Sequence, residues 1–215
     1  MRIKYAIFDL DGTILDSMEI WANIGDELLQ LYDIIPPKDL QEILTPMSIE
    51  QSAEYLKETF PLPLSVNQII DWIIKKVEEK YRYEIALKPY VWEYLEKLKL
   101  QKVRMGVATA NDDSTTREVL NRLGILDYFE FIITCTEVGC SKENPQIYLA
   151  ATERFGCSPE EIVVFEDAVH CIKTAKNAGF YVVGVGDKSA EKDKEEIQRL
   201  CDLYIDSFRD MEDEK

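Results

Sequence analysis

Residues 3–13 read IKYAIFDLDGT, an apolar run that ends in two aspartates, a glycine and a threonine. A short apolar run bounded by turn residues is typical of a buried strand in a parallel sheet. Ligands of open α/β sheets bind at the carboxyl ends of such strands. The stretch therefore predicts a buried strand that delivers Asp9 and Asp11 to a site.

Similar apolar runs recur along the chain, with helical patterns such as 113–123 and 146–155 between them. Strands that alternate with helices indicate an α/β fold built on a parallel sheet. The further strands are predicted at 104–110, 129–135, 161–165 and 181–185.

The segment 17–88 interrupts this alternation, because its apolar periodicity is helical throughout. Prolines at Pro36-Pro37, Pro46 and Pro61 to Pro63 divide it into about four helices, since proline cannot continue a helix interior. We therefore predict a core of residues 1–16 plus 89–215 with an inserted helical subdomain.

The formal net charge is −16, which disfavours nucleic acid and anionic membrane surfaces as partners. No apolar stretch reaches the eighteen or so residues of a membrane span. Five cysteines without paired C-x-x-C spacing, and a start without a signal peptide, favour a reducing cytoplasm. A single histidine, His170, makes a zinc site improbable, and it is assigned no catalytic role. The acidic end, 206–215, is expected to be a solvated tail.

Asp9 and Asp11 are two carboxylates expected to share one site, because they follow the same strand at a spacing of two residues. Such a pair is tolerable only if a cation lies between them or one takes a proton. Both states suit phosphoryl transfer, in which Asp9 attacks phosphorus and Asp11 protonates the leaving oxygen. The simpler alternative is an acidic turn in which Asp16 caps the next helix.

Three later blocks, 106–111, 141–148 and 163–167, carry polar residues at or after predicted strands. In 141–148, Lys142 is a compact cation that could balance clustered negative charge, and the alternative is a plain surface lysine. Thr109 ends the second strand. Its hydroxyl and the following N–H groups of Ala110 and Asn111 could bind phosphate, although a threonine before a helix is often only a cap.

Glu166 and Asp167 follow the fourth predicted strand. With Asp9 and the Asp11 carbonyl they form a set of hard oxygen ligands that favours Mg²⁺, and the alternative is an acidic helix start.

The chain resembles the haloacid dehalogenase superfamily of phosphohydrolases, whose opening motif stands here as Asp9-Leu10-Asp11-Gly12-Thr13, with the other three blocks following in order. The resemblance covers about Ile3 to Val185. It departs from the family pattern at four positions in the third and fourth blocks: Glu143, Gln146, Ala168 and Cys171.

This resemblance implies a Rossmann-like parallel sheet core with helices on both faces and an inserted α-helical cap. It implies that Lys142 holds the phosphoryl group together with the nucleophile, and that Asp167 binds the metal directly while Glu166 ligates or supports it. The implied sites are catalytic Asp9 and Asp11, phosphate-binding Thr109, Ala110, Asn111 and Lys142, and Mg²⁺ ligands Asp9, Asp11, Asp167 and Glu166.

The expected function is a Mg²⁺-dependent phosphatase that acts on a small phosphorylated metabolite through an aspartyl-phosphate on Asp9. Asp11 argues against carbon–halogen cleavage, because a halide needs no acid to leave. A mutase similar to β-phosphoglucomutase is the alternative, but Trp21 stands where those enzymes have a histidine, and residues 45–51 contain no arginine. A non-catalytic binding module is the third hypothesis. A monomer is the default.

Overall fold

The computed structural model describes residues 3–44 and 47–212, and the chain divides into two compact units. The first comprises Met1–Asp16 and Ile85–Lys215, and the second comprises Ser17–Glu84. Residues 85–88, which the sequence placed in the insertion, join the first unit. The reason is main-chain pairing: the Asp16 N–H donates to the Ala86 carbonyl at 3.0 Å, and the Lys88 N–H donates to the Ile14 carbonyl at 2.9 Å.

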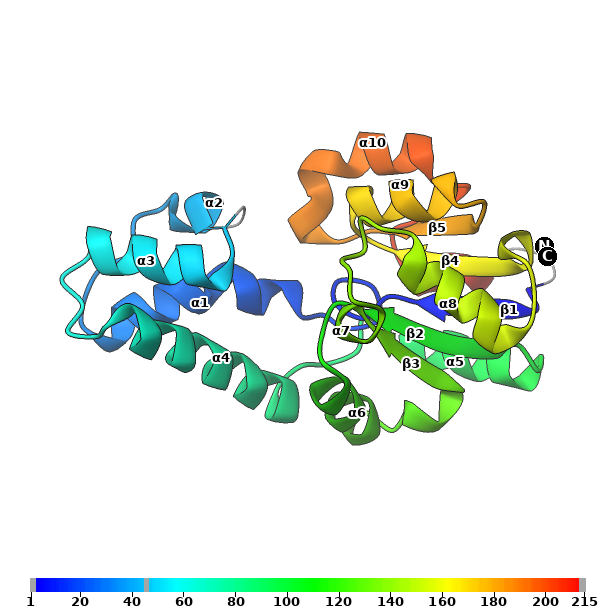
Figure 1. Cartoon of the computed structure of the whole chain (residues 1–215), viewed down its shortest axis with the longest axis horizontal. Coiled ribbons are helices and arrows are strands. Elements are labelled where there is room, and N and C mark those ends of the chain that lie inside the picture. Colours follow the sequence, from blue (N-terminus) through cyan, green and yellow to red (C-terminus); the bar gives the residue numbers. More distant parts are fainter. Residues whose placement is uncertain (1–2, 45–46, 213–215) are drawn as a thin grey trace. The chain divides into compact units, whose positions relative to one another are not determined.

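The first unit is built on a six-stranded parallel sheet of order β3-β2-β1-β4-β5-β6 (Figure 1). The predicted parallel sheet is thus confirmed, with one additional strand, β6, at its edge. That strand has three residues, too few for a clear apolar pattern. The strands are β1 Tyr5–Phe8, β2 Arg104–Thr109, β3 Phe131–Thr134, β4 Ile162–Glu166, β5 Tyr181–Val185 and β6 Leu203–Ile205.

The register of the sheet brings the ends of its three central strands level. Phe8 pairs with Val107 on one side and with Phe165 on the other. The residues that follow these partners therefore emerge at one edge of the sheet, because parallel strands all point the same way. Polar residues at the ends of β1, β2 and β4 are brought to a common site in this way.

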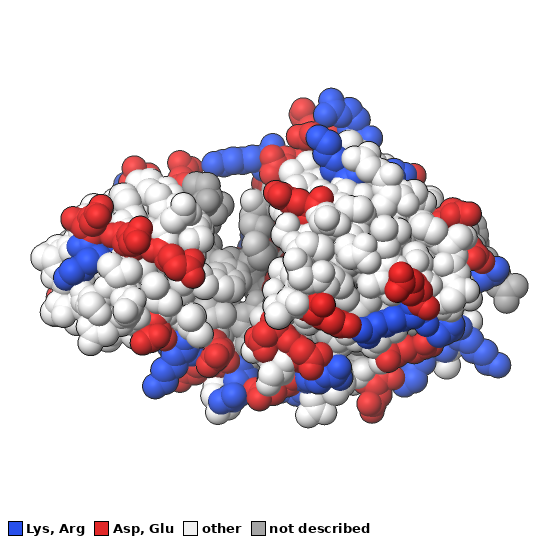
Figure 2. Space-filling view, viewed as in Figure 1, with Lys and Arg blue, Asp and Glu red and all other residues white. Residues whose placement is uncertain are grey.

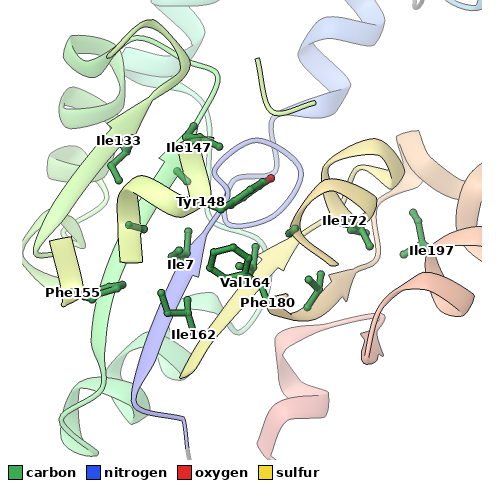
Figure 3. Packing of buried hydrophobic residues seen from close by; sticks show 14 residues of the cluster. Ile7, Ile133, Ile147, Tyr148, Phe155, Ile162, Val164, Ile172, Phe180 and Ile197 are labelled. Atoms are coloured by element: carbon green, nitrogen blue, oxygen red, sulfur yellow. The ribbon is translucent and has the colours of Figure 1, made fainter. Parts of the chain in front are cut away.

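Helices cover both faces of the sheet (Figure 1). Ile7 and Val164 point to the face covered by α8 and α9, where Tyr148 and Ile172 complete the core cluster (Figure 3). Their neighbours in the strands point the opposite way, as strand alternation requires. The helices of this unit are α5 Val91–Leu100, α6 Asp113–Arg122, α7 Cys135–Val138, α8 Gln146–Phe155, α9 Val169–Asn177 and α10 Lys194–Leu200.

The second unit is helical, as predicted, with α1 Met18–Leu31, α2 Leu40–Leu44, α3 Ile49–Thr59 and α4 Val66–Tyr83. Capping boxes at Ser48 and Ser65 fix the starts of α3 and α4, because each serine accepts an N–H of the first turn. The predicted break at Pro46 lies outside the described residues. No helix in the described part of the chain combines the length and apolar character needed to cross a bilayer.

The sequence predicts a solvated acidic tail over 206–215. For the residues that the structure describes, which end at Glu212, this prediction is wrong. Residues Phe208–Glu212 form a 3-10 helix, and Phe208 is 2% exposed. The Phe208 ring lies 5.9 Å from that of Phe165 and 5.4 Å from that of Tyr94, measured between centroids. Two apolar side chains, Phe208 and Met211, turn into the core, while Arg209 and Asp210 between them are exposed.

Replacing Phe208 with alanine should therefore destabilise the first unit. Loss of a buried phenylalanine costs about 3 kcal/mol of unfolding free energy, since the cavity relaxes only partly. Urea denaturation followed by circular dichroism measures the change. Leu100→Ala is the control, because Leu100 is 76% exposed and its loss should have little effect. Equal stability of the two variants would contradict the packing of this segment.

Candidate active site

The turn after β1 places Asp9 and Asp11 at the carboxyl edge of the sheet. The Asp9 N–H donates to the Phe165 carbonyl at 3.0 Å, so Asp9 still belongs to the strand ladder. The chain then reverses, because Ile14 and Leu15 N–H groups both donate to the Leu10 carbonyl. Gly12 has φ of 81°, a left-handed conformation that glycine adopts at little cost. Asp11 lies in this tight turn, directly after the strand ladder ends.

Lys142 connects the first and fourth sequence blocks through its ammonium group. Its Nζ donates to Asp9 Oδ1, and to Glu166 Oε1 at 2.8 Å. The lysine and both carboxylates are buried, with the Lys142 side chain 6% exposed. The structure therefore brings together residues that lie far apart in the sequence, as the motif order predicted.

Three carboxylates gather at this edge. Asp9, Glu166 and Asp167 each offer an oxygen, and these atoms all lie within 4.8 Å of one another. One ammonium, that of Lys142, lies against the set, so the cluster carries excess negative charge when all three are ionised. The Thr13 hydroxyl donates to Asp167 Oδ1 at 3.5 Å, and so long a hydrogen bond offsets little of the excess negative charge.

Burial and the neighbouring charges both shift the pKa values of the cluster. Burial raises the pKa of Glu166 to about 7, and the Asp9 charge adds to the rise while Lys142 opposes it. Burial, followed by the Asp9 and Glu166 charges, raises the pKa of Asp167 well above its ordinary value. Burial alone would lower the pKa of Lys142, but the two facing carboxylates outweigh it and raise that pKa.

This donor set fits a hard divalent cation. Oxygen ligands from carboxylates are those that Mg²⁺ binds, and a divalent charge would offset the surplus. Asp9, Glu166 and Asp167 each offer one ligand oxygen, and Oε1 of Glu166 also accepts from two donors, Lys142 and Tyr148. Glu166 is thus in direct contact with Lys142. Asp11 is half-buried and is not among the three grouped carboxylates.

The loop after β2 presents groups that suit a phosphate. Thr109 is fully buried, and its hydroxyl oxygen accepts the Asn111 N–H at 3.0 Å, which leaves the hydroxyl able to donate its own hydrogen. Asn111 Oδ1 accepts the Asp112 N–H at 3.0 Å, so this residue shapes the loop. Asp112 in turn caps α6 by accepting from Thr115. With the Asn111 N–H engaged, that of Ala110 is the better candidate for a phosphate oxygen.

Tyr148 is a site residue to which the sequence assigned no role. Its hydroxyl donates to Glu166 Oε1 at 2.7 Å, and the side chain is fully buried. The signal available was its place on the core face of α8, six residues after Lys142, but a tyrosine there is as easily plain core. His170, by contrast, is exposed.

The departures from the family pattern are accommodated locally. The Asn144 side chain accepts the Gln146 N–H at 3.0 Å and so orders the start of α8. The Glu143 carbonyl accepts from the Thr174 hydroxyl at 3.3 Å, which joins this loop to α9. Cys171 is buried beside the cluster, and burial, followed by the Glu166 charge, raises the pKa of its thiol. An unreactive thiol of this kind packs as a small apolar group.

Comparison with known proteins agrees with this geometry. Residues 6–185 match the family model described as haloacid dehalogenase-like hydrolase. A protein named β-phosphoglucomutase from Bacillus subtilis is 30% identical over 86% of this chain and 84% of its own length. A protein named phosphorylated carbohydrates phosphatase from Thermotoga maritima is 26% identical over 82% of each chain.

Solved structures support the fold. The crystal structure of CbbY from Rhodobacter sphaeroides in complex with phosphate has a TM-score of 0.76 and 22% identity, and covers 97% of this chain and 96% of its own. At that identity the likeness concerns the fold alone. Together with the family match, it confirms the Rossmann-like core inferred from the sequence.

Tyr148→Phe should destabilise the protein by about 1–2 kcal/mol, because a buried charged acceptor loses one of its two donors. Chemical denaturation of the metal-free protein measures this difference. Tyr90→Phe is the matched control in the same unit, since Tyr90 is 41% exposed. A loss no larger than that of the control would show that the Tyr148 hydroxyl does not support Glu166.

Proposed function

The chain belongs to the haloacid dehalogenase-like hydrolases, and we propose that it is a Mg²⁺-dependent phosphatase acting on a small phosphorylated sugar through an aspartyl-phosphate on Asp9. The observation that carries the proposal is the buried contact of the Asp9 carboxylate with Lys142, beside the carboxylates of Glu166 and Asp167. Relatives named as phosphatases of phosphorylated carbohydrates and hexitols suggest the substrate class.

Asp9 is the proposed nucleophile. Its ionised carboxylate oxygen attacks phosphorus in line, the bond from phosphorus to the ester oxygen breaks, and the phosphoryl group stays on Asp9. Lys142 balances the charge of nucleophile and phosphate as a fixed cation, while Thr109 and the Ala110 N–H donate to the phosphate oxygens. Burial of these groups strengthens each interaction, because water screens them little.

Asp11 is the proposed acid and base. It gives a proton to the departing alkoxide, which leaves as an alcohol, and then takes a proton from the water that attacks the aspartyl-phosphate. The products are the alcohol and inorganic phosphate, with Asp9 and Asp11 restored. The half-buried position of Asp11, one residue beyond the buried cluster, suits a group that exchanges protons with substrate and water.

Mg²⁺ would be held by Asp9, Asp167 and the Asp11 main-chain carbonyl, with Glu166 in support, and would neutralise charge on the transferring phosphoryl group. The residues suit this task because their own charges are incompletely balanced by Lys142.

A sugar phosphomutase is the second candidate, because one relative at 30% identity is named a β-phosphoglucomutase. Against it, residues 45–51 contain no arginine to grip a second phosphate, and Trp21 stands where such mutases have a histidine. Incubation with a sugar phosphate and its bisphosphate, followed by product analysis, separates the two: isomer formation indicates a mutase, whereas free phosphate indicates a phosphatase.

We further propose a cytoplasmic protein whose partner is its small substrate. All five cysteines are free, as suits a reducing compartment. On the face shown in Figure 2, acidic and basic side chains are interspersed, a pattern that offers no extended basic surface there to nucleic acid or anionic lipid.

Asp9→Asn should abolish phosphate release, by at least about a thousandfold, because an amide is not a nucleophile toward phosphorus. The assay is phosphate release from a panel of phosphorylated sugars, nucleotides and small acids, with Mg²⁺ or chelator. Asp16→Asn is the matched control, since Asp16 lies in the same loop but is exposed. Substantial turnover in Asp9→Asn would overturn the assignment, and inactivity of the wild type on the whole panel would favour a mutase or a non-catalytic module.

Mg²⁺ should raise the melting temperature more at about pH 8 than at about pH 5.5. Glu166 and Asp167 have raised pKa values in the folded metal-free protein, so at low pH bound protons compete with the cation. As the pH rises through these values the metal-free protein loses the stability that protonation gave, and Mg²⁺ restores it. Thermal denaturation with Mg²⁺ or chelator tests this, and Asp167→Asn should lose most of the Mg²⁺ effect. An effect independent of pH, or retained in that variant, would place the cation elsewhere.

A further inference from the structure

Lys88 is a second nearly buried lysine of the first unit, distinct from Lys142. Its Nζ donates to the Gly12 carbonyl and to the Gly186 carbonyl, the latter at 2.8 Å. The same Nζ lies 2.8 Å from Asp187 Oδ2. An ammonium has three hydrogens, and these three acceptors account for all of them. Lys88 therefore ties together three segments: its own, the turn after β1 and the loop after β5.

The contacts of Lys88 converge on the turn that carries Asp11. The carbonyl of Gly12, the residue after Asp11, accepts a hydrogen bond from the Lys88 side chain. The Lys88 main-chain N–H donates to the Ile14 carbonyl at 2.9 Å. Within the turn, the Gly12 N–H donates to the Leu15 carbonyl at 3.1 Å. Both the main chain and the side chain of Lys88 thus restrain residues that follow the proposed acid.

Asp187 is fixed as firmly as the lysine it faces. It accepts from the Ser189 N–H at 2.8 Å and from the Ser189 hydroxyl at 2.7 Å. Burial alone would raise the pKa of Asp187, but the hydrogen bonds from Lys88 and Ser189 outweigh it and hold that pKa below its ordinary value. The side chains of Lys88 and Asp187 are 12% and 6% exposed. A shielded ion pair with every partner satisfied holds one geometry, unlike a surface pair.

Nothing in the proposed chemistry requires this lysine to touch phosphate. Its three hydrogens are directed to protein oxygens, so it is not available as a phosphate donor in the way that Lys142 is. Its charge nevertheless reaches the site, because Lys88 opposes the rise in the pKa of Asp167, which burial chiefly causes. The Lys88 ammonium thus both restrains the backbone of the turn after β1 and offsets part of the negative charge of the carboxylates.

From these contacts we infer that Lys88, held by Asp187, is a positioning residue that keeps the Asp11–Gly12 turn in the conformation in which Asp11 protonates the leaving group. The inference rests on the proposed phosphatase function. It assigns to the pair an effect on the proton transfers of Asp11, of which protonation of the alkoxide is the one in the first chemical step, rather than on attack by Asp9.

The test compares two esters that differ in their need for an acid. p-Nitrophenolate leaves without protonation, whereas the alkoxide of a sugar phosphate needs it. The rate compared is that of the first step, alcohol release in a single turnover with enzyme in excess, because the later attack of water also uses Asp11 and is common to both esters. Lys88→Met should lower this rate about tenfold or more for the panel's best sugar phosphate, since general acid catalysis contributes about a hundredfold or more, but by less than about threefold for p-nitrophenyl phosphate. Asp187→Asn should change the two rates in the same unequal way to a smaller extent, and it carries the comparison if Lys88→Met does not fold.

Lys97→Met is the matched control. Lys97 is also a part-buried lysine of this unit whose Nζ donates to a carbonyl, that of Met211, at 2.8 Å. Its loss should destabilise the protein without changing the ratio of the two single-turnover rates. An equal fall for both esters in Lys88→Met, or no fall for either, would overturn the positioning role while leaving the phosphatase assignment intact. Failure of the wild type to hydrolyse either ester would overturn the proposed function, and this inference with it.

Discussion

The unbalanced negative charge around Lys142 is the constraint on which the site depends. Three buried carboxylates, those of Asp9, Glu166 and Asp167, approach one another within reach of a single ion, and one ammonium lies among them. Buried charges are tolerable only when each is paired with an opposite charge or accepts or donates hydrogen bonds. Lys142 and Tyr148 supply some of these partners, and a divalent cation with a phosphate substrate would complete the set.

The sheet makes this arrangement possible. β1 lies between β2 and β4 in parallel register, so the residues that follow these three strands emerge at one edge, where Lys142 from the segment before α8 joins them. Apolar layers on both faces hold the strands in that register, with Tyr148 and Ile172 on one side and Tyr94 and Phe208 on the other. This packing fixes the positions of the strand ends, and preorganised donors stabilise a transition state better than donors that must first be oriented.

The turn after β1 needs support of another kind, because strand pairing stops at Asp9. Hydrogen bonds to the Leu10 carbonyl close the turn from within, and the Lys88–Asp187 pair holds it from outside. The segment that contains Lys88 enters the first unit directly after the helical unit ends at Glu84. The segment with which the chain returns to the first unit thus also restrains the turn that carries Asp11, the proposed acid and base.

The sequence by itself determined the α/β class, five of the six strands and the helical character of the insertion. It also named the three carboxylates that the structure groups, together with Asp11, whose carboxylate is not in that group. It could do so because strand and helix periodicity are local, and because polar residues after apolar strands of a parallel sheet must meet at one edge. Only the tertiary structure decided that Tyr148 donates to Glu166, that Lys88 belongs to the core unit, and that Phe208 is buried beneath Phe165. Each of these depends on contacts between residues distant in sequence, and neither a lysine after a helix nor a phenylalanine in an acidic stretch carries a local pattern that reveals its partner.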